Sequence, residues 1–247
     1  MARDYAQEIR LRTEFIANIL KNADANGIIY GNSGGKDCTL VGILCRMVTK
    51  NVLGVIMPCE SSVNYNADKE HALLAAEQFG IKTTLVDLTK TKQSLTDAIG
   101  PDSVGILASR NIAPRLRMTT LYTIGQSMGY LVAGTGNLSE HTMGYFTKWG
   151  DGAFDFNPIA DLCATEVLDF LRYLGAPPAI VDKPPSAGLF EGQTDEMELD
   201  ISYADIDNYI LNGIAAEENI KRIENAKKRS LHKYGGGIRY PDKIGGM

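Results

Sequence analysis

A glycine-rich loop lies between an apolar run and a helical apolar pattern near the start of the chain. Residues 28–30 form the run, the loop reads GNSGGKD over 31–37, and apolar residues recur at helical spacing up to Val48. A strand, a glycine-rich loop and a helix in this order gather backbone N–H groups and a helix N-terminus around one concavity, which suits a phosphate. The segment therefore predicts a phosphate site on an α/β scaffold, and a glycine-rich turn without a ligand is the alternative.

Apolar runs and helical patterns alternate along the first half of the chain. Runs at 52–57, 81–88 and 130–133 are interleaved with helical patterns at 67–79 and 111–129, and a helix is expected at 1–24. This alternation predicts an α/β protein with a doubly wound, mainly parallel sheet and helices on both faces. The carboxyl ends of such strands form the ligand-binding edge.

The second half is less regular. Residues 144–158 are rich in glycine and aromatic residues and are expected to form a loop, whereas helices are expected at 165–174 and, as a pair, within 203–231. The irregular stretch 183–199 predicts a functional or disordered segment, and the glycine-rich residues 234–247 predict a flexible tail. Residues 1–247 are interpreted as a single domain.

Charge and cysteine content exclude some classes of function. Lys and Arg number 25 against 30 Asp and Glu, a net charge of -5, which disfavours general nucleic-acid binding. No apolar stretch approaches ~18 residues, so no membrane association is expected. The 4 cysteines form no CxxC pair and no zinc-finger spacing, which favours reduced thiols in a cytoplasmic protein.

Two carboxylates are candidate metal ligands. Asp37 begins the helix that follows the first loop, where a Mg²⁺ ion would reconcile it with phosphate; a favourable helix-dipole position is the alternative. Glu140 closes a second glycine cluster, GTGNLSE, just after the strand expected at 130–133. Loops that follow parallel strands share one edge, so Glu140 is a second candidate ligand. A capping box with Asn137 is its alternative role.

Other motifs are weaker. The first loop lacks Walker A spacing, and although it satisfies G-x-S-x-G around Ser33, too few strands precede it for a nucleophile elbow. The basic residues could grip an anionic substrate or lie on a solvated face: Arg115, Arg117, Lys148, His232 and Lys233.

Taken together, the motifs resemble the NAD synthetases of the N-type ATP pyrophosphatase superfamily. They are SGGKD, RLRM, GTGNLSE, GYFTKWGDGAFDFNPIADL, KPPSAGLFEGQTDE and HK, in that order, over residues 28–233. The resemblance implies an adenine-nucleotide alpha-hydrolase-like fold and a ligase that uses ATP, Mg²⁺ and ammonia. Its reaction would be amidation of deamido-NAD through an adenylate, giving NAD, AMP and pyrophosphate. It also implies a homodimer, and a mobile lid at residues 183–199 that orders over ATP.

The resemblance also implies roles for individual residues. ATP would contact Gly31, Asn32, Ser33, Gly34, Gly35, Lys36, Asp37, Cys38, Thr135 and Ser186. Mg²⁺ would bind Asp37 and Glu140. Deamido-NAD would contact Arg115, Lys148, Asp155, His232 and Lys233. Asp151 would hold ammonia or take its proton.

Two positions depart from the family pattern. Cys38 stands where serine is usual, and Ala164 stands where a lysine commonly meets the ATP phosphates, unless Lys36 or Lys183 substitutes. These departures keep three alternatives open: a related ligase for another carboxylate, a tRNA-thiolating enzyme with Cys38 as sulfur carrier, and a non-catalytic dinucleotide-binding module. The chain has no room for a glutamine amidase domain, so free ammonia or a separate partner is the expected nitrogen source.

Overall fold

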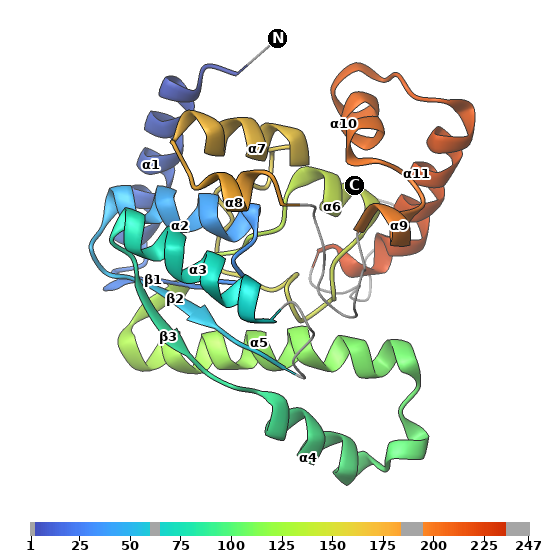
Figure 1. The fold of residues 1–247 in the computed structure, drawn as a ribbon, viewed down its shortest axis with the longest axis horizontal. Helices are drawn as coiled ribbons and strands as arrows, with labels where there is room; N and C mark the ends of the chain where they lie inside the picture. The colour runs from blue at the N-terminus through green and yellow to red at the C-terminus, as the bar shows by residue number, and fades with distance from the viewer. Residues whose placement is uncertain (1–2, 60–64, 184–194, 236–247) are drawn as a thin grey trace.

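The computed structural model describes residues 3–59, 65–183 and 195–235, which are arranged around a parallel sheet. Its strands are β1 (Gly27–Gly31), β2 (Val52–Ile56), β3 (Lys82–Leu85) and β4 (Tyr130–Val132). The strand order is β3-β2-β1-β4, and every pairing is parallel (Figure 1). The chain winds outward from β1 to β3 and then returns to the other side of β1 as β4. The order in which strands are added therefore reverses between β1 and β4, although all four strands stay parallel.

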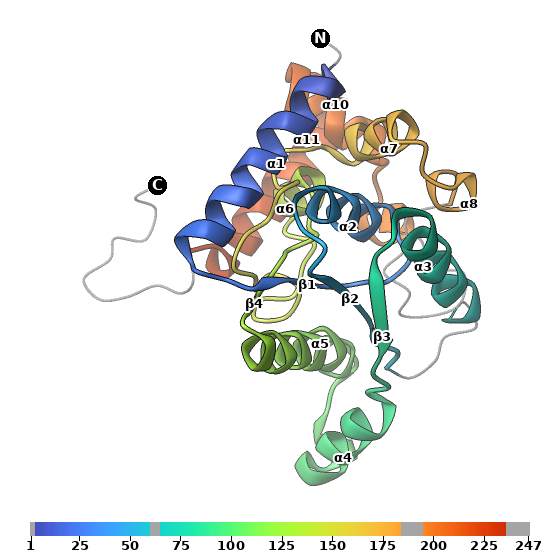
Figure 2. The same ribbon diagram turned by 90° about the vertical axis from the view of Figure 1, so that its left-hand side faces the viewer.

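Helices cover both faces of the sheet. Figure 2 shows α1 (Tyr5–Asn22), α2 (Lys36–Val48) and α3 (Tyr65–Phe79) on one face and α5 (Ile106–Met128) on the other, with α4 (Thr89–Ile99) beyond it. β1 is buried on both sides: Ile28 and Tyr30 join the core under α1 and α2, while Ile29 joins the core against α5. Alternate side chains of a strand face opposite ways, so a continuous apolar run is required here. The predicted doubly wound α/β fold is confirmed.

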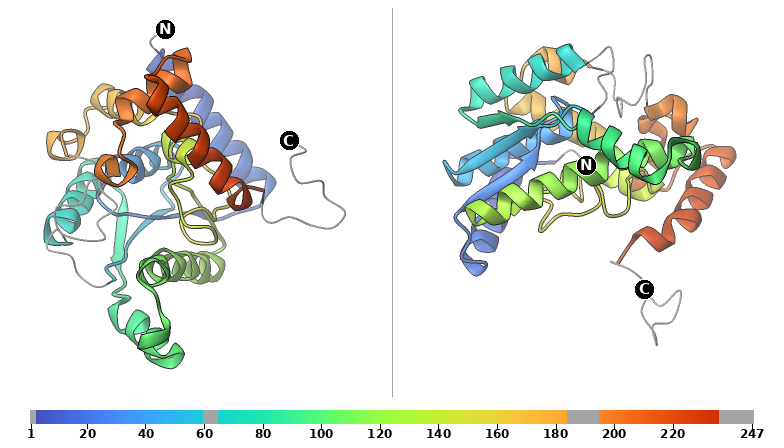
Figure 3. Two further views of the ribbon diagram at one scale, coloured as in Figure 1. Left: turned by 90° about the vertical axis from the view of Figure 1, so that its right-hand side faces the viewer. Right: turned by 90° about the horizontal axis from the view of Figure 1, so that it is seen from below.

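The remaining helices fall into two groups. They are α6 (Leu138–Met143), α7 (Ala164–Tyr173), α8 (Pro178–Val181), α9 (Asp195–Leu199), α10 (Tyr203–Asn212) and α11 (Glu217–Ser230). Helices α7 and α8 pack against α2 in the main core, whereas α6, α9, α10 and α11 lie beyond the carboxyl ends of the strands (Figure 1). Residues of α6, α10 and α11 share a small core that includes Met143, Ile206 and Ile223 (Figure 3). Within the described ranges, no helix combines the length and apolar character needed to span a bilayer.

The element boundaries differ from the sequence prediction in several places. α4 was not expected, because it is largely polar, and the short helix α6 was anticipated only through the alternative capping box of Asn137 and Glu140. α5 begins at Ile106 rather than 111 and carries Pro114 inside it. β3 is shorter than the expected 81–88. Residues 184–194 of the expected lid and 236–247 of the expected tail lie outside the described residues.

Candidate active site

The loops after β1 and β4 leave the sheet at the point where the strand order reverses. The first runs from Asn32 to α2, and the second runs from Ala133 to α6. Loops at such a reversal diverge and leave a crevice at the carboxyl edge of the sheet, where ligands bind in doubly wound proteins. The two glycine-rich motifs therefore meet at one edge, as their positions after strands indicated.

The first loop is held in one conformation by its own side chains. Asn32 Oδ1 accepts a hydrogen bond from the Gly34 N–H at 3.2 Å, and Ser33 Oγ accepts one from the Gly35 N–H at 3.4 Å. Gly34 has φ +73°, and a Cβ there would lie 2.1 Å from the carbonyl oxygen of Asp68 in α3. Only glycine combines this backbone conformation with such a close approach.

Cys38 is a buried thiol that supports the loop. Its Sγ donates to the Gly35 carbonyl at 3.1 Å and lies 3.4 Å from Ser33 Oγ. Burial raises the pKa of the Cys38 thiol above its ordinary value. A protonated, buried thiol is a poor nucleophile, which does not favour a sulfur carrier. Ser33 makes no hydrogen bond to a histidine in the described ranges, so a nucleophile elbow is not supported either.

The two candidate metal ligands belong to one polar network. Asn137 Nδ2 donates to Asp37 Oδ1 at 3.0 Å, and Asn137 and Glu140 form the capping box of α6. The capping role suggested for Glu140 is therefore confirmed, and it leaves the carboxyl close enough to feel Asp37. Burial, and then the charge of Asp37, raise the pKa of Glu140 to about 8. Half-buried carboxylates that repel each other in this way are stabilised by a cation.

Lys36 supplies the positive charge beside these carboxylates. Its Nζ lies 2.5 Å from Asp37 Oδ2 and 5.6 Å from the centre of the Tyr203 ring. Tyr203 Oη donates to Asp195 Oδ2 at 3.2 Å, and the charge of Asp195 also acts on Lys36 and Glu140. We call Lys36, Asp37, Glu140 and Asp195 the acidic cluster. Sequence reasoning missed Asp195 and Tyr203, although Asp195 lies in the quoted motif KPPSAGLFEGQTDE.

The acidic cluster fits a divalent cation. In the described part of the chain, no three His, Cys, Asp or Glu side chains are arranged to hold a metal ion by themselves. Mg²⁺ does not require such a cage, because it binds through one or two carboxylates together with water and substrate phosphates. Asp37 and Glu140, which repel each other and lie beside a helix N-terminus, meet that need.

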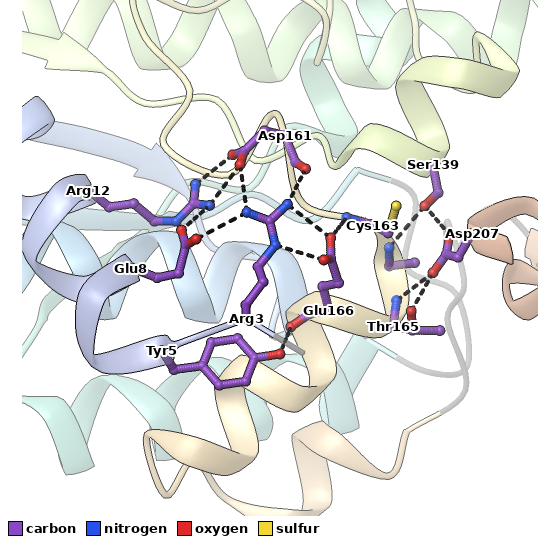
Figure 4. A network of polar contacts seen from close by, with 11 residues as sticks. Arg3, Tyr5, Glu8, Arg12, Ser139, Asp161, Cys163, Thr165, Glu166 and Asp207 are labelled. Carbon is purple, nitrogen blue, oxygen red and sulfur yellow. Dashed lines mark hydrogen bonds and ion pairs between the residues drawn. The ribbon is translucent and has the colours of Figure 1, made fainter. Parts of the chain in front are cut away.

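A buried aspartate, Asp207 of α10, ties the first turns of α6 and α7 together (Figure 4). Its Oδ1 accepts from Ser139 Oγ, while its Oδ2 accepts from the Thr165 N–H at 2.8 Å and the Thr165 hydroxyl at 2.7 Å. Ala164 lies in the same turn, is buried, and shares a core with Tyr203. Its methyl group carries no charge, so Ala164 itself cannot supply the phosphate contact that the family resemblance implies for a lysine at this position.

Figure 4 also shows a second network, which fastens the N-terminal region to the loop before α7. Arg12 donates to both oxygens of Asp161, and Arg3 pairs with Glu166 at 2.7 Å and with Asp161 at 3.1 Å. All the carboxylates of this network are already paired with arginines. We assign it a structural role in holding α1 against the start of α7.

A second group of charged residues surrounds the loop 144–152. Lys233 Nζ donates to the carbonyl oxygens of Gly144 at 2.8 Å and Phe146 at 2.9 Å. Lys148 Nζ donates to the His232 carbonyl, and Arg117 Nε donates to the Met57 carbonyl at 3.1 Å. We call Arg117, Lys148 and Lys233 the cationic cluster.

Asp151 lies next to the cationic cluster. Its Oδ1 accepts from the Thr147 N–H at 3.0 Å. The carboxyl is accessible to solvent, but the protein packed around it raises its pKa, and the charge of Arg117 opposes that rise. In turn, Asp151 counteracts the lowering of the Lys233 pKa by burial. Asp151 is thus a carboxylate with a raised pKa that lies beside Arg117 and Lys233.

The other predicted substrate contacts are placed unevenly. Arg115 is exposed and its Nε donates to the Lys148 carbonyl at 3.3 Å, and the exposed His232 belongs to the segment that Lys148 holds. Asp155 also supports the sheet, because it accepts from the Val132 N–H at 2.7 Å and from Tyr122 Oη at 3.2 Å. Thr135 lies in the loop after β4. Ser186 lies outside the described residues.

Comparison with known proteins agrees with this geometry. The NAD synthase family model matches residues 8–234. The NH(3)-dependent NAD(+) synthetase of Carboxydothermus hydrogenoformans is 44% identical over 230 residues, which cover 90% of this chain and 93% of that protein.

Solved structures of related enzymes share the fold. The NMN synthetase of Francisella tularensis is 29% identical, with a TM-score of 0.92 over 97% of this chain and 100% of that chain. The NH3-dependent NAD synthetase of Campylobacter jejuni, in complex with the nitrate ion, is 26% identical, with a TM-score of 0.79 over 98% of this chain and 100% of that chain. The chain belongs to the NAD synthase family.

Proposed function

We propose that this protein is an NH3-dependent NAD synthetase, which amidates deamido-NAD with ammonia at the expense of ATP. A carboxylate oxygen of deamido-NAD bonds to the α-phosphorus of ATP, and the bond to the β-phosphate oxygen breaks to release pyrophosphate. Ammonia then bonds to the acyl carbon, AMP leaves with the oxygen, and one proton is lost. No protein nucleophile is required, so the chain contributes positioning and electrostatics.

The acidic cluster and the first loop form the proposed ATP site. The loop 31–38 and the N-terminus of α2 would bind the phosphates, and Asp37 and Glu140 would hold Mg²⁺ beside them. When bound, the metal would supply neutralisation of the charge on the departing pyrophosphate. The electrostatic conflict between Asp37 and Glu140 supports this assignment, because a bound cation would relieve it.

The cationic cluster and its neighbours form the proposed deamido-NAD site. Lys148 and Lys233, with Arg115 and His232 nearby, would attract the dinucleotide phosphates. Asp155, which is exposed and bonded to the end of β4, would also contact deamido-NAD. Asp151 would orient ammonia and accept the proton it loses, since its carboxyl remains accessible and its basicity is raised by the surrounding protein.

We also propose a second copy of this chain as partner. Helix α4 and the start of α5 expose large apolar side chains, and Ile106 and Leu107 are 77% and 70% exposed. An apolar surface of this kind favours burial in an interface. Light scattering coupled to size exclusion should give twice the chain mass, and Ile106→Glu with Leu107→Glu should halve it.

The observation that carries the proposed reaction is 44% identity to an NH(3)-dependent NAD(+) synthetase over 90% of this chain. The test incubates the protein with ATP, Mg²⁺, deamido-NAD and ammonium, with controls that omit each component. NAD and AMP should form in equal amounts only in the complete mixture. AMP or pyrophosphate without NAD would indicate another carboxylate, and ligand binding without any product would indicate a non-catalytic homologue.

A second candidate substrate is nicotinate mononucleotide, the carboxylate that corresponds to NMN. The specific observation is the TM-score of 0.92 to an NMN synthetase, against 0.79 to the NAD synthetase of Campylobacter jejuni. Both acids present the same reacting carboxylate and differ in the adenylate half. Measuring kcat/KM for the two acids under one set of conditions decides between them, and we expect deamido-NAD to be preferred.

A further inference from the structure

The ammonium of Lys36 forms an ion pair with the Asp37 carboxylate in this structure. It lies 2.5 Å from Oδ2, while Oδ1 accepts a hydrogen bond from Asn137 Nδ2 at 3.0 Å. Both oxygens of Asp37 are therefore engaged. Each oxygen keeps a second lone pair, but a metal ion bound to Asp37 would be repelled by the ammonium beside Oδ2, whereas the amide of Asn137 is neutral and is also fixed as the cap of α6.

Lys36 is suited to neutralise an acidic site. Its side chain is 7% exposed, and it lies within the field of Asp37, Glu140 and Asp195. The described ranges contain two other buried cations, Arg12 and Lys92, and neither belongs to this cluster. One buried and two half-buried carboxylates without a counter-charge would be unfavourable. Lys36 thus does in the free protein what a bound cation would do.

The Tyr203 ring offers the Lys36 ammonium a second favourable contact. The ammonium lies over the Tyr203 ring, 5.6 Å from its centre, so the aromatic face can hold the charge when the carboxylate is lost. Tyr203 shares its core with Ala164, whose methyl side chain brings no charge of its own to this site. Lys36 begins α2, at the loop where we place the nucleotide phosphates.

We propose that Lys36 is an internal cation that holds the place of the metal ion on Asp37 and transfers to the nucleotide phosphates when a divalent cation binds that carboxylate. This inference rests on the proposed function for the position of the nucleotide. It assigns two opposite effects to one side chain: Lys36 competes with the metal in the free protein, and it supports the nucleotide in the loaded protein.

Replacing Lys36 tests both effects. In the nucleotide-free protein, Mn²⁺ affinity is measured by the electron paramagnetic resonance signal of the unbound ion. Lys36→Met should bind Mn²⁺ about tenfold more tightly than the wild type, because competition and metal binding are linked. The same variant should bind the non-hydrolysable analogue AMPCPP, with Mg²⁺ present, about tenfold more weakly by titration calorimetry.

Two further variants separate this role from a change in folding or net charge. Lys36→Arg keeps a cation beside Asp37 and should retain wild-type Mn²⁺ affinity within about twofold. Lys221→Met removes an exposed lysine paired with Glu217 on α11 and should change neither affinity. A purely structural role for Lys36 would weaken both ligands together, so the opposite signs are the diagnostic result.

Equal or weaker Mn²⁺ binding by Lys36→Met would overturn the inference, as would unchanged AMPCPP affinity. These outcomes are independent of the proposed reaction, which is judged by formation of NAD by the wild type. A wild type that binds Mn²⁺ and AMPCPP but forms no NAD would refute the reaction and leave the role of Lys36 to be decided by the variants.

Discussion

The acidic cluster and the cationic cluster differ in the partners of their positively charged side chains. In the acidic cluster, the ammonium of Lys36 is paired with a full negative charge on Asp37. In the cationic cluster, Lys148, Lys233 and Arg117 donate to backbone carbonyls, which carry only partial charge. A carboxylate cancels a cation, whereas a carbonyl orients it and leaves its charge to act on a ligand. The first cluster is thus prepared for a cation and the second for an anion.

The largest effect should come from breaking the loop that carries the acidic cluster. Gly34→Ala places a side chain at φ +73° and a Cβ 2.1 Å from the Asp68 carbonyl oxygen, which belongs to backbone and cannot move aside. We expect a loss of about 3 kcal/mol in the free energy of unfolding, measured by denaturant titration.

Gly213→Ala is the matched control, because Gly213 has φ +71° but no atom within 4 Å of the added Cβ. It should cost about 1–2 kcal/mol from backbone conformation alone. Equal losses in the two variants would show that the close approach of α3 to the loop is unimportant.

A second test removes a cation whose charge is not cancelled. Lys233→Met should raise the KM for deamido-NAD by about 10–100-fold, the range expected for one charged hydrogen bond. The KM for ATP should change less than about twofold, because the acidic cluster is untouched. Steady-state kinetics with each substrate varied in turn measures both. Lys227→Met, on the same C-terminal segment, is the control, and equal rises in both KM values would argue against separate sites.

The third test concerns pH. Asp151 must be ionised to accept a proton, so activity should fall as pH drops through its pKa, which the surrounding protein raises. Because the charge of Arg117 lowers that pKa, Arg117→Met should move the acid limb of kcat to higher pH by about 0.5–1 unit. Profiles are compared at constant free ammonia. Arg117→Lys keeps the charge and should leave the limb in place, and an unmoved limb in Arg117→Met would remove Asp151 from this role.

The smallest effect is expected at Cys38. Serine in its place can still donate to the Gly35 carbonyl and is a stronger donor than a thiol. Cys38→Ser should therefore keep the rate of NAD formation within about threefold of the wild type. Complete loss of activity would instead support sulfur chemistry at Cys38.

Sequence patterns predicted the sheet and the proximity of Asp37 to Glu140, for local reasons. Loop GNSGGKD and loop GTGNLSE each follow an apolar strand, and parallel strands bring such loops to one edge. Asp37 and Glu140 therefore meet, and Asn137 links them as both a cap and a hydrogen-bond donor. Periodicity did not predict α4, because its residues are largely polar, or the early start of α5 around Pro114.

The contributions of α9 and α10 could not be predicted in this way. Asp195, Tyr203 and Asp207 occupy ordinary helical positions, and nothing nearby in the sequence indicates that they face Lys36, Glu140 or Ser139. Their role depends on how the C-terminal helices pack against α6. Asp155 is the converse case: its motif suggested substrate, but the structure also uses it to hold β4.

By itself, the sequence determined the parallel α/β scaffold, the family and the strand–loop–helix form around the first loop, because strand alternation, glycine content and helix starts act over a few residues. Only the tertiary structure decided which charges are cancelled and which remain available. Lys36 and Lys233 look alike in the sequence, yet one meets a carboxylate and the other meets carbonyls. Lys36 pairs with its sequence neighbour Asp37, but packing between distant segments brings Glu140 and Asp195 close to it and brings Lys233 to the carbonyls of Gly144 and Phe146. That packing sets what each cluster can bind.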